Sequence, residues 1–243
     1  MSFFASLLGN PRQSTGARLL ERLSTATQLE DRRGAIADFK DLTAAEPVRL
    51  IDRGGMSVLT QLLREEDTQL TRDILETLSN LLDPDIPRQV AETAAVKPAD
   101  KVAHNASVFL LHDSNVNDVL NASEDADLYV RYHAVQVIMK LLAIDRPKTQ
   151  QCVLNTPATV GRVMSLMDDR REIVRNEVLL LLAKLGEGSD GLQNILAFQG
   201  AFEQLLTIIE NEAQEEGGRG GVIVHDCIRI ISSLLASNAS CCR

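Results

Sequence analysis

Few residues of this 243-residue chain combine a reactive type with a spacing that chemistry requires, and the G-x-G-x-x-G match at residues 186–191 is the first to test. Between a strand and a helix, this pattern lets the backbone approach the pyrophosphate of a dinucleotide. Here it follows a long apolar segment of helical period, so we interpret it as a helix stop and a loop. Arg219, among glycines, forms a lone RGG sequence and is an equally weak signal. We predict no cofactor.

The histidines and cysteines do not suggest a metal centre. His104 and His112 could share a helix face, but no carboxylate or cysteine stands at the spacing of a further ligand. Cys152 and Cys227 lie within predicted helices, and the other two cysteines are adjacent at 241–242, which matches neither a zinc site nor a disulfide framework. This usage suits a reduced, cytosolic compartment. No serine, threonine or cysteine has a visible base partner, so we predict no metal, no catalytic residue and no enzyme.

The composition indicates a globular, helical protein. Hydrophobic residues make up 44% of the chain and aromatic residues only 3%, so the core must consist of aliphatic side chains, which suits packed helices. The net charge of −9 argues against nucleic acid as a partner, because phosphate binding needs a basic surface. No signal peptide is visible, and no apolar run reaches the length of a membrane span.

The elements that would position a site are helices that repeat along the chain. An apolar triplet at i, i+3 and i+6 recurs at intervals of roughly 40 to 60 residues, as expected for three-helix repeats of the armadillo type. The triplets are Ile36/Phe39/Leu42, Leu75/Leu78/Leu81, Val135/Ile138/Leu141, Leu179/Leu182/Leu185 and Ile228/Ile231/Leu234. The alternative is an irregular bundle of five amphipathic helices. A shared lead-in of a short and a medium helix favours the repeat, so we predict an all-α fold, an armadillo-like α-solenoid of stacked three-helix repeats.

This pattern divides the chain into four parts. They are a leader (1–13), N-terminal capping helices (14–46), armadillo-like repeats (47–236, with units at about 47–82, 102–144, 147–185 and 191–236) and a tail (237–243). A short helix from Pro47 is expected to close at Gly54-Gly55, and Pro157 is expected to open a second helix. Residues 83–101 give no clear pattern, and residues 212–221 are expected to form an exposed loop.

The candidate site is a groove lined by the third helices of successive repeats. The residue just before the last member of each triplet is polar, which predicts a ladder of Asp41, Asn80, Lys140, Lys184 and Ser233. An arginine precedes four of the triplets, namely Arg33, Arg72, Arg131 and Arg175. These side chains could meet a partner's acidic groups, or they could bridge to acidic residues of neighbouring repeats. The predicted partner-binding residues are Asn80, Lys140, Lys184, Arg72, Arg131 and Arg175.

Several segments resemble the head of the general vesicular transport factor family, the golgin-type tethers. They are 28–35 with its Leu-x-Asp-Arg-Arg core, 75–82, 129–142, 162–185 with REIVRNEVLLLLAKL, 197–206 and 221–227. The order and spacing of these segments, which cover most of residues 28–236, make the match specific. The chain lacks heptads after Ala236 and an acidic tail, so it corresponds to the first part of such a head.

The resemblance implies an armadillo-type head of a vesicle tether in ER-to-Golgi and intra-Golgi transport. It implies binding to a Rab-type GTPase and to Golgi or vesicle tethering and fusion proteins, together with homodimerisation. The expected location is cytoplasmic and peripheral on Golgi or vesicle membranes. An alternative that the residues leave open is an armadillo-type adaptor for an extended peptide, although the chain lacks the tryptophan array of peptide-binding transport receptors. The apolar last helix suggests that a further repeat or another subunit covers it.

Overall fold

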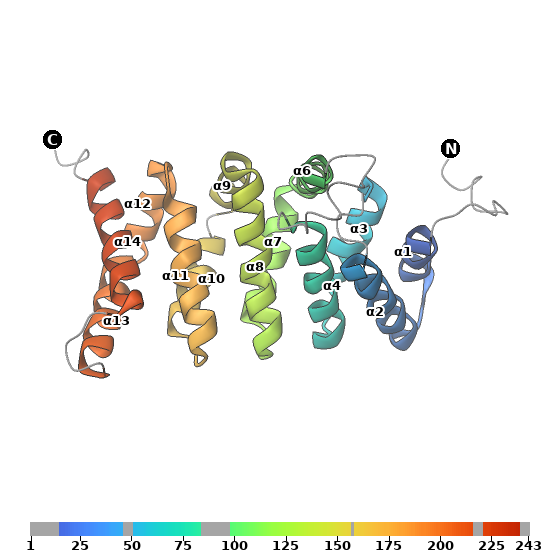
Figure 1. The fold of residues 1–243 in the computed structure, drawn as a ribbon, viewed down its shortest axis with the longest axis horizontal. Coiled ribbons are helices and arrows are strands. Elements are labelled where there is room, and N and C mark those ends of the chain that lie inside the picture. Colours follow the sequence, from blue (N-terminus) through green and yellow to red (C-terminus); the bar gives the residue numbers. More distant parts are fainter. Residues whose placement is uncertain (1–14, 46–50, 84–97, 157, 216–220, 239–243) are drawn as a thin grey trace.

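The fold is an elongated array of helices, as Figure 1 shows from end to end. The computed structural model describes residues 15–45, 51–83, 98–156, 158–215 and 221–238. Within these ranges every regular element is a helix and none is a strand. None of these helices is long and apolar enough to cross a membrane.

The helices of the described ranges follow one another along the chain. The first are α1 (Thr15–Thr25), α2 (Leu29–Ala45), α3 (Arg53–Leu62) and α4 (Thr68–Leu81). Next come α6 (Pro98–Phe109), α7 (Asp113–Asn121), η2 (Ala122–Glu124) and α8 (Leu128–Ile144). The rest are α9 (Arg146–Leu154), α10 (Ala158–Ser165), η3 (Leu166–Asp168), α11 (Glu172–Gly186), α12 (Asp190–Phe198), α13 (Ala201–Glu215) and α14 (Val222–Asn238).

Five of these helices, α2, α4, α8, α11 and α14, form a row in which each packs against the next. We call this set the third-helix row. Its triplets supply the centre of the core: Leu75, Leu78 and Leu81 are fully buried in α4, and the triplets of α8 and α11 are at most 2% exposed. The predicted all-α, armadillo-like solenoid is therefore confirmed.

Acidic N-caps set the start of several helices. The carboxylate of Asp67 accepts the backbone N–H of Leu70 at 2.8 Å, and that of Asp127 accepts the N–H groups of Tyr129 and Val130. An aspartate there satisfies free backbone donors and favours the positive end of the helix dipole.

The prediction that Gly54-Gly55 close a short helix is wrong. Both glycines lie in the first turn of α3, because Asp52 acts as the N-cap and accepts the Gly55 N–H at 2.7 Å. A side chain at Gly55 would meet Leu20 Cδ1 at 2.8 Å, so the small residue lets α1 approach α3. Pro47, the expected start of the short helix, lies outside the described residues.

The predicted triplet in α14 is wrong at its first member, Ile228, whereas Ile231 packs against the core and Leu234 is buried. Ile228 is 51% exposed, whereas Cys227, Ile230 and Leu234 point inward at 3% exposure or less. Apolar residues surround much of this helix, so their spacing alone does not select a face. The side that packs on α11, α12 and α13 decides which residues are buried.

Three smaller expectations also change. The third helix is the longest in each complete set, but the short-then-medium order fails because α6 is longer than α7. His104 lies in α6 and His112 caps α7, so they do not share a helix face. Residues 212–215 belong to α13 rather than to a loop.

Some predictions fall on residues outside the described ranges, namely the leader 1–13, residues 84–97, Pro157, Arg219 and residues 239–243. The repeat boundaries stay a prediction.

Candidate protein-interaction surface

The predicted polar ladder includes residues that join neighbouring third helices. Asn80 Nδ2 on α4 donates to Thr43 Oγ1 on α2 at 3.3 Å. Lys140 Nζ on α8 donates to the Ser79 carbonyl at 3.0 Å and to Asp83 Oδ2 at 2.9 Å. Lys184 on α11 is exposed. Two of the ladder positions therefore hold the repeats together, and Lys184 is left on the surface.

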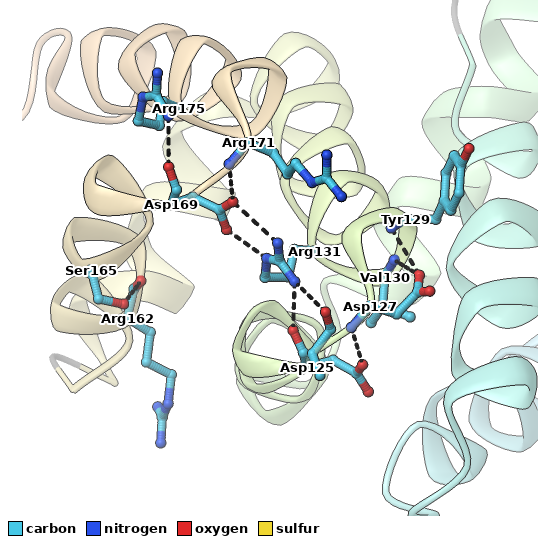
Figure 2. A network of polar contacts seen from close by, with 11 residues as sticks. Asp125, Asp127, Tyr129, Val130, Arg131, Arg162, Ser165, Asp169, Arg171 and Arg175 are labelled. Carbon is cyan, nitrogen blue, oxygen red and sulfur yellow. Dashed lines mark hydrogen bonds and ion pairs between the residues drawn. The ribbon is translucent and has the colours of Figure 1, made fainter.

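The most highly connected of the predicted arginines is Arg131, which Figure 2 shows at the junction of two repeats. Its Nε and Nη2 donate to the two carboxylate oxygens of Asp169 at 2.6 and 3.1 Å. Its Nη1 donates to the carbonyls of Asp125 and Ala126 at 2.9 and 2.8 Å. Every one of these contacts is internal, so Arg131 bridges α8 to the loop before α11.

Arg175 repeats one part of this arrangement. Its Nη1 donates to the Asp169 carbonyl at 2.8 Å, six residues back, as Arg131 Nη1 does to Asp125. Arg72 Nη2 donates to Gln69 Oε1 on its own helix at 2.7 Å. Arg33 pairs with Asp67, the N-cap of α4, so a bridge of the Arg131–Asp169 type also joins α2 to α4. Whether Arg72 and Arg175 also bind a partner stays a prediction.

The carboxylate of Asp169 is held ionised by these contacts. Its side chain is only 6% exposed, and burial alone would raise its pKa. The hydrogen bonds from Arg131 and from the Arg171 N–H, with the charges of Arg131 and Arg175, outweigh burial and lower the pKa below its ordinary value.

A second buried polar cluster, which the sequence patterns did not predict, links α2 to α4. Asp73 is 2% exposed; its carboxylate accepts from Lys40 Nζ at 2.7 Å and from Gln69 Nε2 at 2.7 Å. Lys40 Nζ also lies 3.5 Å from Glu76 Oε2. The hydrogen bond to Asp73 is the main cause that raises the pKa of Lys40. The sequence feature that could have indicated this cluster is the i, i+4 spacing of Gln69 and Asp73, which places both side chains on one face of α4.

His133 lies half-buried on α8 near this cluster. Its ring makes an edge-to-face contact with Tyr132, with centroids 5.5 Å apart. Burial lowers its pKa, and the nearby Glu76 only partly opposes that effect. The imidazole is therefore mainly neutral at pH 7, and it adds no charge to the third-helix row.

A cavity of about 350 Å³ opens between α11 and α14. Leu182, Leu196 and Leu234 form apolar walls, and Lys184 and Arg229 are the cations that line it. Gln193 Nε2 donates to Ser233 Oγ at 2.9 Å across the same space. Glu187 also lines the cavity, so one carboxylate stands beside the two cations, and the volume is at the lower end of the range for ligand pockets.

Within the described residues, the sequence motifs that could carry chemistry do not come together as a reaction centre. Gly186 ends α11, Gly188 has a φ of +72°, and Ser189 caps α12, so the G-x-G-x-x-G match joins two helices. Cys152 is buried, and burial followed by a hydrogen bond to Asp113 raises the pKa of its thiol to about 12. In the described ranges no three histidine, cysteine, aspartate or glutamate residues are grouped to hold a metal ion.

The helix row and its surface define the class of the protein as an armadillo-like α-solenoid. The crystal structure of Uso1-1 matches 91% of this chain and 37% of its own, with a TM-score of 0.77 and 24% identity. A computationally designed armadillo repeat protein matches 90% of this chain and 82% of its own, with a TM-score of 0.65 and 17% identity. At these identities the similarity establishes the fold.

The sequence relatives identify the family. General vesicular transport factor p115 of Bos taurus is 31% identical over 251 residues, which cover 99% of this chain and 26% of p115. Golgin candidate 6 of Arabidopsis thaliana is 34% identical over 87% of this chain and 23% of its own length. No protein-family model matches. The chain belongs to the general vesicular transport factor family, as its residue patterns predicted, and spans about a quarter of the length of p115.

Proposed function

We propose that this chain is a non-catalytic protein-interaction scaffold, the head region of a vesicle-tethering factor in ER-to-Golgi and intra-Golgi transport. The observation that carries the proposal is the 31% identity to p115 along nearly the whole chain. The extended row of third helices supports it, because a solenoid of this kind offers a long surface for partners. Relatives in Arabidopsis and in yeasts bear names of golgin and protein-transport factors, which points in the same direction.

The proposed partner is a Rab-type GTPase, bound from the cytoplasm while the protein is peripheral on Golgi or vesicle membranes. Other tethering or fusion proteins would bind along the same scaffold, and two copies would associate. The cavity between α11 and α14 is the proposed contact for the GTPase, since Lys184 and Arg229 add positive charge to a chain of net charge −9.

A pull-down with a panel of Rab proteins in their GTP- and GDP-loaded forms tests this proposal. Retention of one GTP-loaded protein is expected, with loss of at least about tenfold in affinity for Lys184→Glu combined with Arg229→Glu. Arg18→Glu, an exposed charge reversal on α1, is the matched control and should bind normally. Equal or absent binding of both nucleotide states would refute the Rab proposal. A monomeric mass in light scattering would refute self-association.

The second candidate is an adaptor for an extended peptide. The apolar walls and two cations of the same cavity favour it, because they fit an aliphatic side chain next to a carboxylate. Fluorescence anisotropy with short peptides that carry leucine beside glutamate tests this candidate. Binding that Lys184→Glu removes, without any GTPase binding, would favour the adaptor over the tether.

A further inference from the structure

Three exposed apolar residues occupy the same register position on α8, α11 and α14. Tyr129, Ile173 and Val222 each stand twelve residues before the leucine that ends the apolar triplet of their helix, which is Leu141, Leu185 or Leu234. They are 55%, 54% and 78% exposed. The same position is polar on the two earlier helices of the row, with Glu30 on α2 and Gln69 on α4. We call Tyr129, Ile173 and Val222 the apolar stripe.

The stripe follows one edge of the solenoid. α8, α11 and α14 run in the same direction and pack side by side, with their first turns at the lower edge of Figure 1. Packed helices lie about 8–10 Å apart, so neighbouring members of the stripe are expected at that interval. The first turn of a helix normally favours polar and acidic residues, and core packing does not explain an apolar side chain that remains exposed.

Two arginines add positive charge beside the stripe. Arg170 and Arg171 precede Ile173 and are exposed, and no ion pair within the described ranges involves either of them. The exposed Glu172 lies between them and Ile173, so these three side chains leave one net positive charge beside the stripe. The backbone N–H of Arg171 donates to Asp169 Oδ1 at 2.8 Å, which fixes the loop at the Arg131 junction. Figure 2 shows the Arg171 side chain extending away from Asp169. These charges are therefore available to a partner, unlike that of Arg131.

We propose that the apolar stripe is a docking surface for an acidic amphipathic helix of a partner protein. Seven residues of an α-helix rise about 10.5 Å, so apolar residues at heptad spacing would reach successive members of the stripe. Glutamates beside those residues would meet Arg170 and Arg171, which complement an acidic rather than a basic segment. The surface is separate from the cavity between α11 and α14, and this inference does not depend on the Rab proposal.

The test uses a synthetic helical peptide of about three heptads with leucine at one heptad position and glutamate beside it. Anisotropy is expected to give a dissociation constant well below about 1 mM, and Ile173→Asp should weaken binding at least about tenfold. Leu111→Asp alters a leucine that is 45% exposed in the turn after α6, and it is the matched control that should bind normally. Circular dichroism of both variants should show an intact fold.

The charge requirement is tested by reversal. Arg170→Glu combined with Arg171→Glu should lose the glutamate peptide and gain a peptide of the same pattern with lysine in place of glutamate. No binding at about 1 mM, equal binding of a peptide with the leucine spacing scrambled, or insensitivity to Ile173→Asp would each overturn the inference. Preference for anionic lipid vesicles over the peptide would assign the stripe to a membrane instead. In the GTPase pull-down, Ile173→Asp should behave as the unaltered chain, which keeps the two proposals separable.

Discussion

The bridge between Arg131 and Asp169 offers a sharp test of how neighbouring repeats are held together. Replacing Arg131 by alanine removes two hydrogen bonds to Asp169 and two to the carbonyls of Asp125 and Ala126. The Asp169 carboxylate would then stay buried, at 6% exposure, without the cation that offsets its desolvation.

The expected loss of stability follows from this burial. Breaking a fully buried ion pair by removing one partner costs about 3–5 kcal/mol, whereas an exposed pair contributes about 0–1 kcal/mol. Arg131 keeps 14% of its side chain exposed, and Asp169 keeps the Arg171 N–H. We therefore expect Arg131→Ala to lower the free energy of unfolding by about 2–4 kcal/mol. Arg131→Lys should also destabilise, because an ammonium group cannot reproduce the bidentate contact.

Equilibrium urea unfolding followed by circular dichroism measures this loss. The double variant Arg131→Ala with Asp169→Asn should be less destabilised than the sum of the single variants, with a coupling of about 1–3 kcal/mol. Arg170→Ala, one residue from Asp169 but exposed, should change stability by less than about 0.5 kcal/mol. A loss below about 1 kcal/mol for Arg131→Ala, or additive single variants, would show that the bridge does not hold the repeats together.

The other predictions concern the core, a turn, acid stability and thiol reactivity. Leu182→Asp places a carboxylate at a site 1% exposed and should abolish cooperative melting, as it costs several kcal/mol. Gly188→Ala should lower the free energy of unfolding by about 1–2 kcal/mol, because an L residue is strained at a φ of +72°. No atom lies within 4 Å of the added methyl group, so the cost comes from the backbone alone. The hydrogen bond from Arg33 lowers the pKa of Asp67 in the folded chain. As the pH falls below about 4, Asp67 is protonated in the unfolded chain before it is in the folded chain, so the free energy of unfolding decreases. Asp67→Asn should make this decrease smaller in urea titrations at several pH values. Burial raises the pKa of the Cys227 thiol to about 11, so alkylation at pH 8 should be slow until the chain unfolds.

Each of these has a direct control. Unchanged melting of Leu182→Asp would show that the buried face of α11 is assigned wrongly. Gly34→Ala, in the middle of α2 with space for a methyl group, should stabilise by up to about 1 kcal/mol and contrast with the turn glycine. Identical acid profiles for Asp67→Asn and the unaltered chain would refute the role of the Arg33 pair. Fast native alkylation, located by peptide mass spectrometry, would contradict the buried thiol.

The row of third helices was predictable because aliphatic residues at helical spacing recur with similar lead-ins. The buried face of α14 was not, since apolar residues such as Ile228 and Ile230 stand on more than one side of that helix. Its register is decided by contacts with α11, α12 and α13, which the local pattern does not contain. Asp52 likewise allows glycines to begin α3, because a good N-cap outweighs their low helix propensity.

The candidate surface was predictable only in part. The sequence located Lys140 and Arg131 on the third helices, but their partners lie far along the chain, at Asp83 and Asp169. The stacking of repeats determines which arginine pairs with a residue of a neighbouring repeat and which remains exposed. The apolar stripe also needed the structure, because the sequence pattern does not tell whether apolar residues such as Tyr129 and Ile173 are covered by a neighbouring helix or left exposed.

Contact between consecutive members of the row has a further consequence for how the chain opens and closes. α4, α8 and α11 are flanked on both sides, whereas α14 has a row neighbour among the described helices only at α11. In amide hydrogen exchange, backbone protons in the middle of the row should therefore be the slowest to be replaced by deuterium, and protection should decline toward α14. With such a gradient, α14 would open before the middle helices of the row, which would stay folded.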